Sequence, residues 1–395
     1  MSADQPSVCV VGAGVIGLSV AWRLAESGCR VRLFDPAPGN GATYAAAGML
    51  APVSESAFGE TEVLELGVES LRRWPEFAAD LERQTDQTVG LRRRGTLLAA
   101  HDADDARELR RFAAFVARHG FPADPLTGRS ARALEPALSP RTSAALAVHG
   151  DHSVDNRALT RALLSATARA GVVLHAGRAV PVLRDGTVAG VDVPDTGDRH
   201  RCDVVVIAAG ADSSTVAGLP AGTVPHVRPV KGQILRFRGA AGLLQRTVRA
   251  RVAGDQVYLV PRDHGELVVG ATTEDVGRDA RVTAGGVHDL LRAATTVVPE
   301  VRELELTEAC ARLRPSAADN LPLIGASSVP GLVLATAHYR GGVLMAPATA
   351  AAVADLVHGR ACTPAAAACA PTRFAARATR RAPVHPSRVT REATA

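Results

Sequence analysis

The chain has 395 residues, 47% of them apolar and 22% charged, which excludes a small single module and a mostly disordered protein. Its formal net charge of +5 lies within residues 361–395, where six Arg and one Glu give +5, so the rest of the chain is neutral overall. A neutral body gives no electrostatic reason to expect nucleic acid as a partner.

Cysteine usage and hydropathy narrow the class of protein further. The six cysteines include no CxxC pair, which argues against a metal site or a disulfide framework and suits a reducing cytosol. The N-terminal residues lack the pattern of a signal peptide. No run reaches the roughly 18 apolar residues of a membrane span. We therefore expect a cytoplasmic protein with no metal and no membrane partner, and we leave open whether it forms a homo-oligomer.

The first predicted elements form one unit. A short strand over residues 8–11 runs into a turn with Gly12, Gly14 and Gly17, and a helical pattern follows over 18–27. In such a turn the first glycine permits the tight bend, the second lets the backbone approach a pyrophosphate, and the third lets the helix pack closely on the sheet.

An acidic residue completes this unit. A second strand over residues 30–34 ends at Asp35, where a carboxylate can accept hydrogen bonds from a ribose. The helix start supplies free amides and the positive end of a dipole for phosphates. The unit predicts dinucleotide binding, although a purely structural glycine turn is the alternative, and it does not distinguish NAD from FAD.

The remaining chain predicts a mixed α/β (α+β) protein with two discontinuous domains. Residues 62–135 are mostly helical in pattern, residues 171–174 and 203–210 predict further strands of the first sheet, and residues 224–269 contain short β patterns. We expect a Rossmann-like dinucleotide-binding domain and a substrate domain built on an antiparallel sheet, followed by a basic tail. The expected boundaries are 1–85, 141–222 and 306–360 for the first domain, 86–140 and 223–305 for the second, and 361–395 for a disordered tail.

Several segments together resemble one enzyme family. They are VVGAGVIG (10–17), ATYAAAGMLAP (42–52), RPVKGQILRF (228–237), VYLVPR (257–262), LVVGATTED (267–275), LRPSAADNLPLIG (313–325) and ATAHYRGGVLMAPATA (335–350). On these segments the chain resembles the flavin-dependent amine and amino-acid oxidases of the D-amino-acid oxidase superfamily, and within it the glycine oxidases of thiamine biosynthesis.

This resemblance implies FAD as the cofactor and assigns the residues that contact it. The implied FAD-contacting residues are Gly12, Gly14, Val15, Ile16, Gly17, Asp35, Pro36, Ala42, Thr43, Ala47, Gly48, Met49, Val180, Gly210, His338, Tyr339, Arg340, Gly341, Gly342, Val343 and Leu344. It also implies that Arg314 and Arg340 hold the substrate carboxylate, with Tyr258 and Met49 bordering the substrate. The position at which some relatives tether the flavin is held by Arg312, with Cys310 two residues earlier, so we expect non-covalent FAD.

The residue types agree with this chemistry, but each has a simpler alternative. Arg314 and Arg340 lie in apolar sequence, where a buried guanidinium needs an anion: a substrate carboxylate held by two hydrogen bonds, or a protein acid in a structural ion pair. The small residues of the 43–49 loop suit a flat ring, or an ordinary connection. Met49 is equally expected in a core.

Other residues near these segments receive minor roles or none. Tyr44 departs from the small residue or hydroxyl expected there and leaves the shape of the cofactor pocket in question. We interpret Lys231 as structural and His338 as shaping the flavin loop, and we assign Gln256 no role. No side chain is expected to act as a catalytic acid or base.

The resemblance implies that glycine or another small amine, such as sarcosine or D-alanine, is oxidised to an imine by hydride transfer to FAD, with O2 reduced to H2O2 and the imine supplied to thiazole synthesis. One alternative is an FAD-dependent D-amino-acid or proline dehydrogenase that passes electrons to a quinone or carrier. Another is a non-catalytic dinucleotide-binding protein or a tRNA-modifying partner that uses the basic tail.

Overall fold

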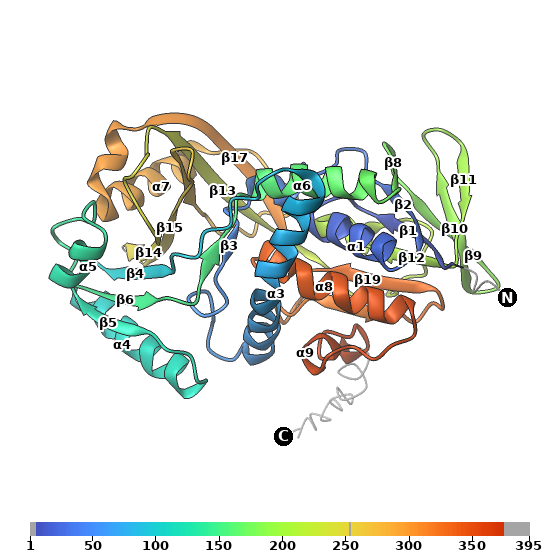
Figure 1. Ribbon diagram of the computed structural model, residues 1–395, viewed down its shortest axis with the longest axis horizontal. Coiled ribbons are helices and arrows are strands. Elements are labelled where there is room, and N and C mark those ends of the chain that lie inside the picture. Colours follow the sequence, from blue (N-terminus) through green and yellow to red (C-terminus); the bar gives the residue numbers. More distant parts are fainter. Residues whose placement is uncertain (1–4, 253, 375–395) are drawn as a thin grey trace, which may run out of the picture.

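The computed structural model describes residues 5–252 and 254–374 and has two main bodies, each built on a large sheet (Figure 1). The first sheet has six strands in the order β18-β19-β12-β1-β2-β8. Their bounds are β1 (Ser7–Val11), β2 (Arg30–Phe34), β8 (Val173–His175), β12 (Val204–Ile207), β18 (Leu323–Ala326) and β19 (Leu332–Thr336). All pair in parallel except the edge strand β18. The valine-rich runs expected at residues 8–11 and 203–210 are buried strands of this sheet, as is typical of parallel sheets covered on both faces.

Helices cover one face of this sheet and meet in a shared core. They are α1 (Val15–Glu26), α3 (Thr61–Thr85), α6 (Asn156–Arg169) and α8 (Gly342–Val357), which lie together in front of the sheet in Figure 1. Pro347 inside α8 has no N–H to donate, and the amide of the next residue, Ala348, donates to Ser70 Oγ (3.2 Å). Ser70 and Trp74 of α3 both donate to Leu344 O, at 2.7 and 2.8 Å, so α3 is hydrogen-bonded to α8 near Pro347.

The second sheet has eight strands in the order β17-β13-β16-β15-β14-β4-β6-β5. Their bounds are β4 (Thr96–Ala100), β5 (Asp124–Thr127), β6 (Ala144–Val148), β13 (Arg228–Arg238), β14 (Thr247–Val252), β15 (Asp255–Pro261), β16 (Glu266–Gly270) and β17 (Glu305–Ser316). The pairs are antiparallel except β14 with β4. One face packs under α7 (Ala284–Val297), with Leu235, Val248, Leu259 and Val269 in its core.

Smaller elements complete the fold. They are the sheet of β9 (Val180–Arg184), β10 (Thr187–Val193) and β11 (Asp198–Arg201), the pair β3 (Met49–Leu50) and β7 (His152–Ser153), the helices α2 (Ala42–Ala45), α4 (Ala103–Arg118), α5 (Gly128–Leu134) and α9 (Pro364–Ala367), and the 3-10 turns η1 (Gly210–Thr215) and η2 (Pro299–Glu303). No helix in the described ranges is long and apolar enough to cross a bilayer.

Sheet membership differs from two of the predicted domain boundaries. β6 lies after the boundary predicted at residue 141, and almost all of β17 lies after the one predicted at 306, yet both strands belong to the eight-stranded sheet. β6 pairs with β4 and β5, and β17 pairs with β13 along its whole length. The chain therefore crosses between the bodies later than predicted at both boundaries, after β6 at the first and after β17 at the second, because strand pairing between distant segments decides where a strand belongs.

The prediction that disorder begins at residue 361 is wrong for residues 361–374. α9 packs against α3 and α8, and Cys369 is fully buried. The Arg373 guanidinium donates to both carboxylate oxygens of Asp319, at 3.0 and 3.1 Å. This segment is part of the folded body, whereas the rest of the predicted tail, residues 375–395, lies outside the described residues.

Candidate active site

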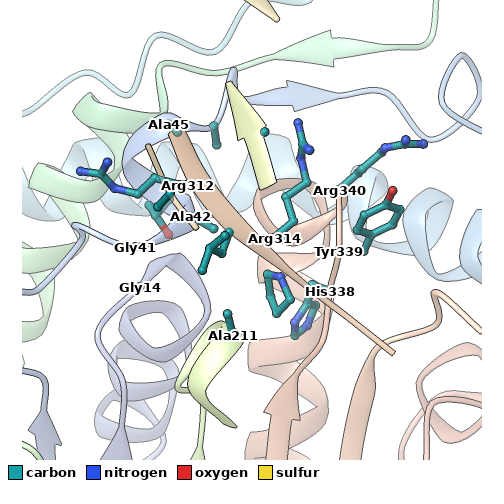
Figure 2. Close-up of a pocket in the computed structure, with 18 of the residues that line it drawn as sticks. Gly14, Gly41, Ala42, Ala45, Ala211, Arg312, Arg314, His338, Tyr339 and Arg340 are labelled. Atoms are coloured by element: carbon teal, nitrogen blue, oxygen red, sulfur yellow. The ribbon is translucent and has the colours of Figure 1, made fainter. Parts of the chain in front are cut away.

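A cavity of about 1410 Å3 lies between the two bodies and is lined by both. At one end it meets the glycine turn after β1, and at the other it meets the eight-stranded sheet. Figure 2 shows Gly14, Gly41 and Ala42 on one side of this pocket and Arg314, Tyr339 and Arg340 on the other.

The glycine turn after β1 leaves no space for side chains. Gly12 has φ +105°, and a Cβ there would lie 2.4 Å from Ala208 O. A Cβ on Gly17 would lie 1.8 Å from Gly12 O, so Gly17 permits the close packing of α1 rather than lining the cavity. Thr43 Oγ1 accepts the Val15 amide at 2.9 Å, which ties the flavin-loop segment to the start of α1. The start of α1 presents backbone N–H groups and a positive dipole end at the cavity.

Asp35 follows β2 at the edge of the cavity. Its carboxylate accepts the amides of Ala13 and Ala37, both at 2.7 Å, which fixes its position beside the glycine turn. A carboxylate has about four lone-pair sites, so two accepted bonds leave capacity for ligand hydroxyls.

The loop predicted to contact a flavin is held from behind by two buried side chains. Gly48 has φ +67°, and a Cβ there would lie 1.9 Å from Val154 O. Arg262 donates to Ala47 O (2.7 Å) and Val154 O (2.8 Å), and burial lowers its pKa to about 10. Asn156 Nδ2 donates to Thr43 O at 2.7 Å. Sequence reasoning assigned no role to Arg262 or Asn156, because neither lies next to the loop in the chain.

Tyr44 does not narrow the cofactor pocket. Its side chain packs between two guanidinium groups, 3.9 Å from Arg157 and 5.1 Å from Arg312 to the ring centre, and the residue does not line the cavity. Arg157 is held in turn by both carboxylate oxygens of Glu308, at 2.8 and 3.0 Å. Tyr44 therefore packs against the arginines behind the loop and does not shape the cofactor pocket.

The start of α8 forms another wall of the cavity. Gly342 and Val343 line it, whereas Gly341 and Leu344 do not. His338 lies just before this helix, 3% exposed, with Nε2 2.9 Å from Thr349 Oγ1. Burial lowers the pKa of His338 to about 3, so the imidazole is neutral near pH 7.

The two predicted carboxylate-binding arginines both line the cavity but differ in setting. Arg314 of β17 is partly buried, and its Nη1 donates to Thr272 O (3.1 Å) and more weakly to Lys231 O (3.4 Å). Arg340 is exposed rather than buried as expected, with Nη2 3.4 Å from Thr273 Oγ1 and its guanidinium 4.8 Å from the centre of the Tyr339 ring. Within the described ranges neither arginine forms an ion pair, so a structural ion pair does not account for them.

Strand register places Tyr258 among cavity-facing residues. It is opposite Arg249 on β14 and opposite Gly270 on β16. Burial raises the pKa of Tyr258, and the nearby positive charge of Arg314 opposes the rise, so its hydroxyl stays protonated near pH 7. Met49 also lines the cavity and packs in the same cluster as Tyr258.

Several polar residues of this wall were missed by sequence reasoning. Arg249 and Glu55 form an ion pair (3.3 Å), and Gln256 and Arg251 also line the cavity. β14, which carries Arg249 and Arg251, was not predicted as a separate strand. The alternation of apolar and charged residues around Val248 and Ala250 was the sequence signal that could have predicted this strand.

The two residues near the expected flavin-tether position, Arg312 and Cys310, differ in whether they line the cavity. Arg312 lines the cavity and donates to the backbone and side-chain oxygens of Asn40, both at 2.9 Å. Cys310 does not line the cavity and is buried among apolar residues, and burial raises the pKa of its thiol. Lys231 is buried and paired with Glu274 at 2.8 Å.

Of the residues predicted to contact cofactor, only Gly17, Gly341 and Leu344 do not line the cavity. The turn at Gly12, the remaining lone pairs of Asp35 and the start of α1 fit the pyrophosphate and ribose of a dinucleotide. The loop around Gly48 and the start of α8 fit a flat ring with polar edges. Fold and site together define a two-domain dinucleotide-dependent oxidoreductase.

Comparison with known proteins identifies the family. The model of the family described as DAO, FAD dependent oxidoreductase, matches residues 7–356. A glycine oxidase of Geobacillus kaustophilus is 35% identical over 353 residues, covering 89% of this chain and 92% of that protein. The bifunctional protein ThiO/ThiG of a Nostoc species is 33% identical over 352 residues, covering 89% of this chain and 52% of that protein. The crystal structure of the Geobacillus kaustophilus glycine oxidase matches with a TM-score of 0.84 at 33% identity, covering 93% of this chain and 99% of that one. The chain therefore belongs to the FAD-dependent oxidoreductases of the DAO family, and its cofactor is FAD.

Proposed function

We propose that this enzyme oxidises glycine, or another small amino acid such as sarcosine or D-alanine, to the corresponding imine. The observation that carries the proposal is Arg314, a partly buried guanidinium in the cavity wall that forms no ion pair within the described residues. A guanidinium held in this way can bind a carboxylate through two charge-assisted hydrogen bonds. The similarity to a glycine oxidase over most of both chains supports the same substrate class.

The cavity wall would orient the substrate by its carboxylate. Arg314 donates its Nη1 to backbone carbonyls and so keeps its planar group fixed, while Arg340 stands at the exposed side with an adjacent hydrogen bond to Thr273. Tyr258 and Met49 border the same region. A pocket that selects a small substrate by excluding bulk gives only modest discrimination against one extra methyl group, which is why sarcosine and D-alanine remain candidates.

FAD, when bound, supplies the two-electron acceptor for the hydride of the substrate Cα–H bond and passes the electrons to O2, giving H2O2. The residues that would hold it are those of the glycine turn, Asp35, the loop ending at Met49 and the start of α8. Non-covalent binding remains a prediction.

The protein residues contribute orientation and charge rather than acid or base catalysis. His338, the histidine in the cavity wall, stays neutral and packs against Thr349. The substrate amine must lose a proton before hydride leaves Cα, so activity should rise with pH as the bound ammonium group deprotonates. Loss of the amine proton and of hydride leaves the imine, which is either passed onward or hydrolysed by water to the oxo acid and ammonia, or methylamine in the case of sarcosine.

We place the reaction in the cytoplasm and in the supply of the imine for thiazole synthesis in the thiamine pathway. The resemblance to glycine oxidases of thiamine biosynthesis and the match to a protein named ThiO/ThiG support this placement. The partners in the proposal are a small amino acid and O2, without nucleic acid, and with homo-oligomerisation left open.

Peroxide release tests the proposal directly. Purified protein with bound FAD is mixed with glycine, sarcosine, D-alanine and D-proline, in air and under nitrogen with an artificial electron acceptor. We expect peroxide from glycine or sarcosine in air. Dye reduction without peroxide from any substrate would instead indicate a dehydrogenase, and no reaction in either condition would refute amino-acid oxidation.

A further inference from the structure

We propose that Gly232 and Gly270 are positioning residues of the substrate pocket: their missing side chains leave the space in which Arg314 and Tyr258 lie against the sheet. The inference rests on the proposed function, because it concerns the shape of the site at which Arg314 would bind the substrate carboxylate.

Gly232 lies beneath the Arg314 guanidinium. It is on β13, opposite Arg312 of β17, and Arg314 reaches over it from two positions further along β17. A methyl carbon on Gly232 would lie 2.3 Å from Arg314 Nη2 and 2.5 Å from both Nη1 and Cζ. Real Cβ atoms essentially never approach that closely, so the guanidinium occupies space that any other residue at position 232 would fill.

Gly270 has the same relationship to Tyr258. It pairs with Tyr258 of β15 on one side and with Ile234 of β13 on the other. A methyl carbon on Gly270 would lie 2.4 Å from the Tyr258 hydroxyl oxygen, 2.5 Å from Tyr258 Cζ and 2.5 Å from Ile234 Cδ1. The phenol ring therefore lies across β16 and points toward β13, the strand that carries Gly232.

Both glycines leave room for side chains. Neither has a positive φ, and every atom nearest to the added methyl is the end of a side chain. At Gly12, in contrast, the nearest atom is the backbone oxygen of Ala208 and φ is +105°. Alanine at 232 or 270 should therefore displace Arg314 or Tyr258 while the sheet stays folded.

The displaced guanidinium would lose the contacts that orient it. Arg314 is held by Thr272 O and Lys231 O, and these carbonyls belong to two segments joined by reciprocal backbone bonds between Lys231 and Glu274 (2.9 and 3.0 Å). The ammonium of Lys231 and the carboxylate of Glu274 add an ion pair at 2.8 Å. The two carbonyl acceptors fix the Arg314 guanidinium on one side, and Gly232 leaves room for it on the other. A shift of the guanidinium away from Gly232 would therefore lengthen these hydrogen bonds. A shift of about 1 Å in a substrate-positioning group can cost roughly 100-fold in rate.

Alanine variants of the FAD-loaded, full-length protein test the inference. Gly232→Ala and Gly270→Ala are compared with Gly150→Ala, where an added methyl meets nothing within 4 Å. Measured quantities are FAD content, melting temperature, kcat and KM for glycine, and the Kd of acetate, a carboxylate without an amine, from the change in flavin absorbance.

We expect Gly150→Ala to match wild type. Gly232→Ala should keep its FAD and raise the acetate Kd and the glycine KM by about tenfold or more, with a smaller change in kcat. Gly270→Ala should lower kcat/KM for glycine by about tenfold or more. In an Arg314→Ala background, Gly232→Ala should change the acetate Kd less than about twofold, because it acts through Arg314.

An unchanged acetate Kd in Gly232→Ala, or loss of folding and FAD in both variants, would overturn the inference. So would a further tenfold loss of acetate affinity in the Arg314→Ala background. If wild type binds acetate but oxidises no amino acid, the proposed function fails while the acetate measurements still decide the role of Gly232. If wild type does not bind acetate, the inference about Gly232 fails, whereas peroxide release from glycine still decides the proposed function.

Discussion

Arg249 and Tyr258 stand directly opposite each other on β14 and β15, and both face the cavity. The Arg249 guanidinium pairs with the Glu55 carboxylate at 3.3 Å, and the two side chains are only 13% and 15% exposed. The pair adds a cation and an anion to the wall and so leaves its net charge unchanged. Arg314 and Arg340 also line the cavity, and neither forms an ion pair within the described residues, so both add positive charge to it.

Breaking this pair should weaken substrate binding. Arg249→Met leaves the Glu55 carboxylate uncompensated in a partly desolvated wall, where it repels an anionic substrate. We expect the KM for glycine to rise by about tenfold, which corresponds to about 1.4 kcal/mol. The double variant Arg249→Met, Glu55→Gln removes both charges and should return KM to near the wild-type value. Equal KM values in the single and double variants would show that the charge of Glu55 does not reach the substrate.

Removing the carboxylate anchors should affect KM to different extents. Arg314→Leu should raise the KM for glycine by about 100-fold, because a charged hydrogen bond in a desolvated site contributes about 2–5 kcal/mol. Arg340→Leu should have a smaller effect, about tenfold, because Arg340 is exposed and solvent screens its charge. Steady-state kinetics measure both effects, and absorbance near 450 nm checks that FAD stays bound. A near-normal KM for Arg314→Leu would refute its assignment.

Stability should depend on pH through His338. The imidazole has a pKa of about 3 when folded and an ordinary value of 6.5 when unfolded. Between these values the unfolded chain binds a proton that the folded chain does not, so the free energy of unfolding falls as pH decreases from 6.5 toward 3, by up to about 1.4 kcal/mol per pH unit.

A variant isolates this contribution. His338→Gln keeps a hydrogen-bonding side chain toward Thr349 but cannot titrate, so its stability should fall less between pH 7 and pH 4.5 than that of wild type. Urea unfolding at several pH values measures the difference. Parallel curves for the two proteins would mean that His338 does not stay neutral.

FAD should leave the protein on denaturation. Arg312 occupies the expected tether position and Cys310 lies outside the cavity wall, so no thiol is placed to bond the flavin. After acid precipitation the yellow colour should remain in the supernatant. Colour retained in the washed pellet would contradict this prediction.

The C-terminal segment should contribute to stability up to residue 374. A chain ending at residue 360 loses the buried Cys369 and the Arg373 ion pair with Asp319, and should melt at a clearly lower temperature. A chain ending at residue 374 keeps these contacts and should melt at a higher temperature than the chain ending at residue 360. Arg373→Ala should cost about 1–3 kcal/mol, because it removes the two hydrogen bonds that the Arg373 guanidinium donates to the partly buried Asp319 carboxylate. Thermal melting of the full chain, the two shortened chains and Arg373→Ala measures these differences.

Local sequence was sufficient to predict those parts of the site that consist of residues adjacent in the chain. The unit from β1 to Asp35 was predicted from a glycine turn between two apolar runs, because a tight turn, a helix start and a buried strand each impose local requirements on residue type. The motifs around Met49, Arg314 and His338 carry the resemblance to the enzyme family, and through that resemblance they also led to residues that line the cavity.

Relations between distant segments were decided only by the tertiary structure. Pairing of β17 with β13 places Arg314 over Gly232, and pairing of β15 with β14 and β16 places Tyr258 beside Arg249 and over Gly270. The same pairing moves β6 and β17 into the second sheet, against the predicted boundaries. Strand alternation tells which residues share a face, but not which strand will be the neighbour, because register is set by packing across the whole sheet. The net charge of +5 can be read from the sequence alone, whereas the settings of Arg314 and Arg340 in the cavity wall depend on contacts that only the fold creates.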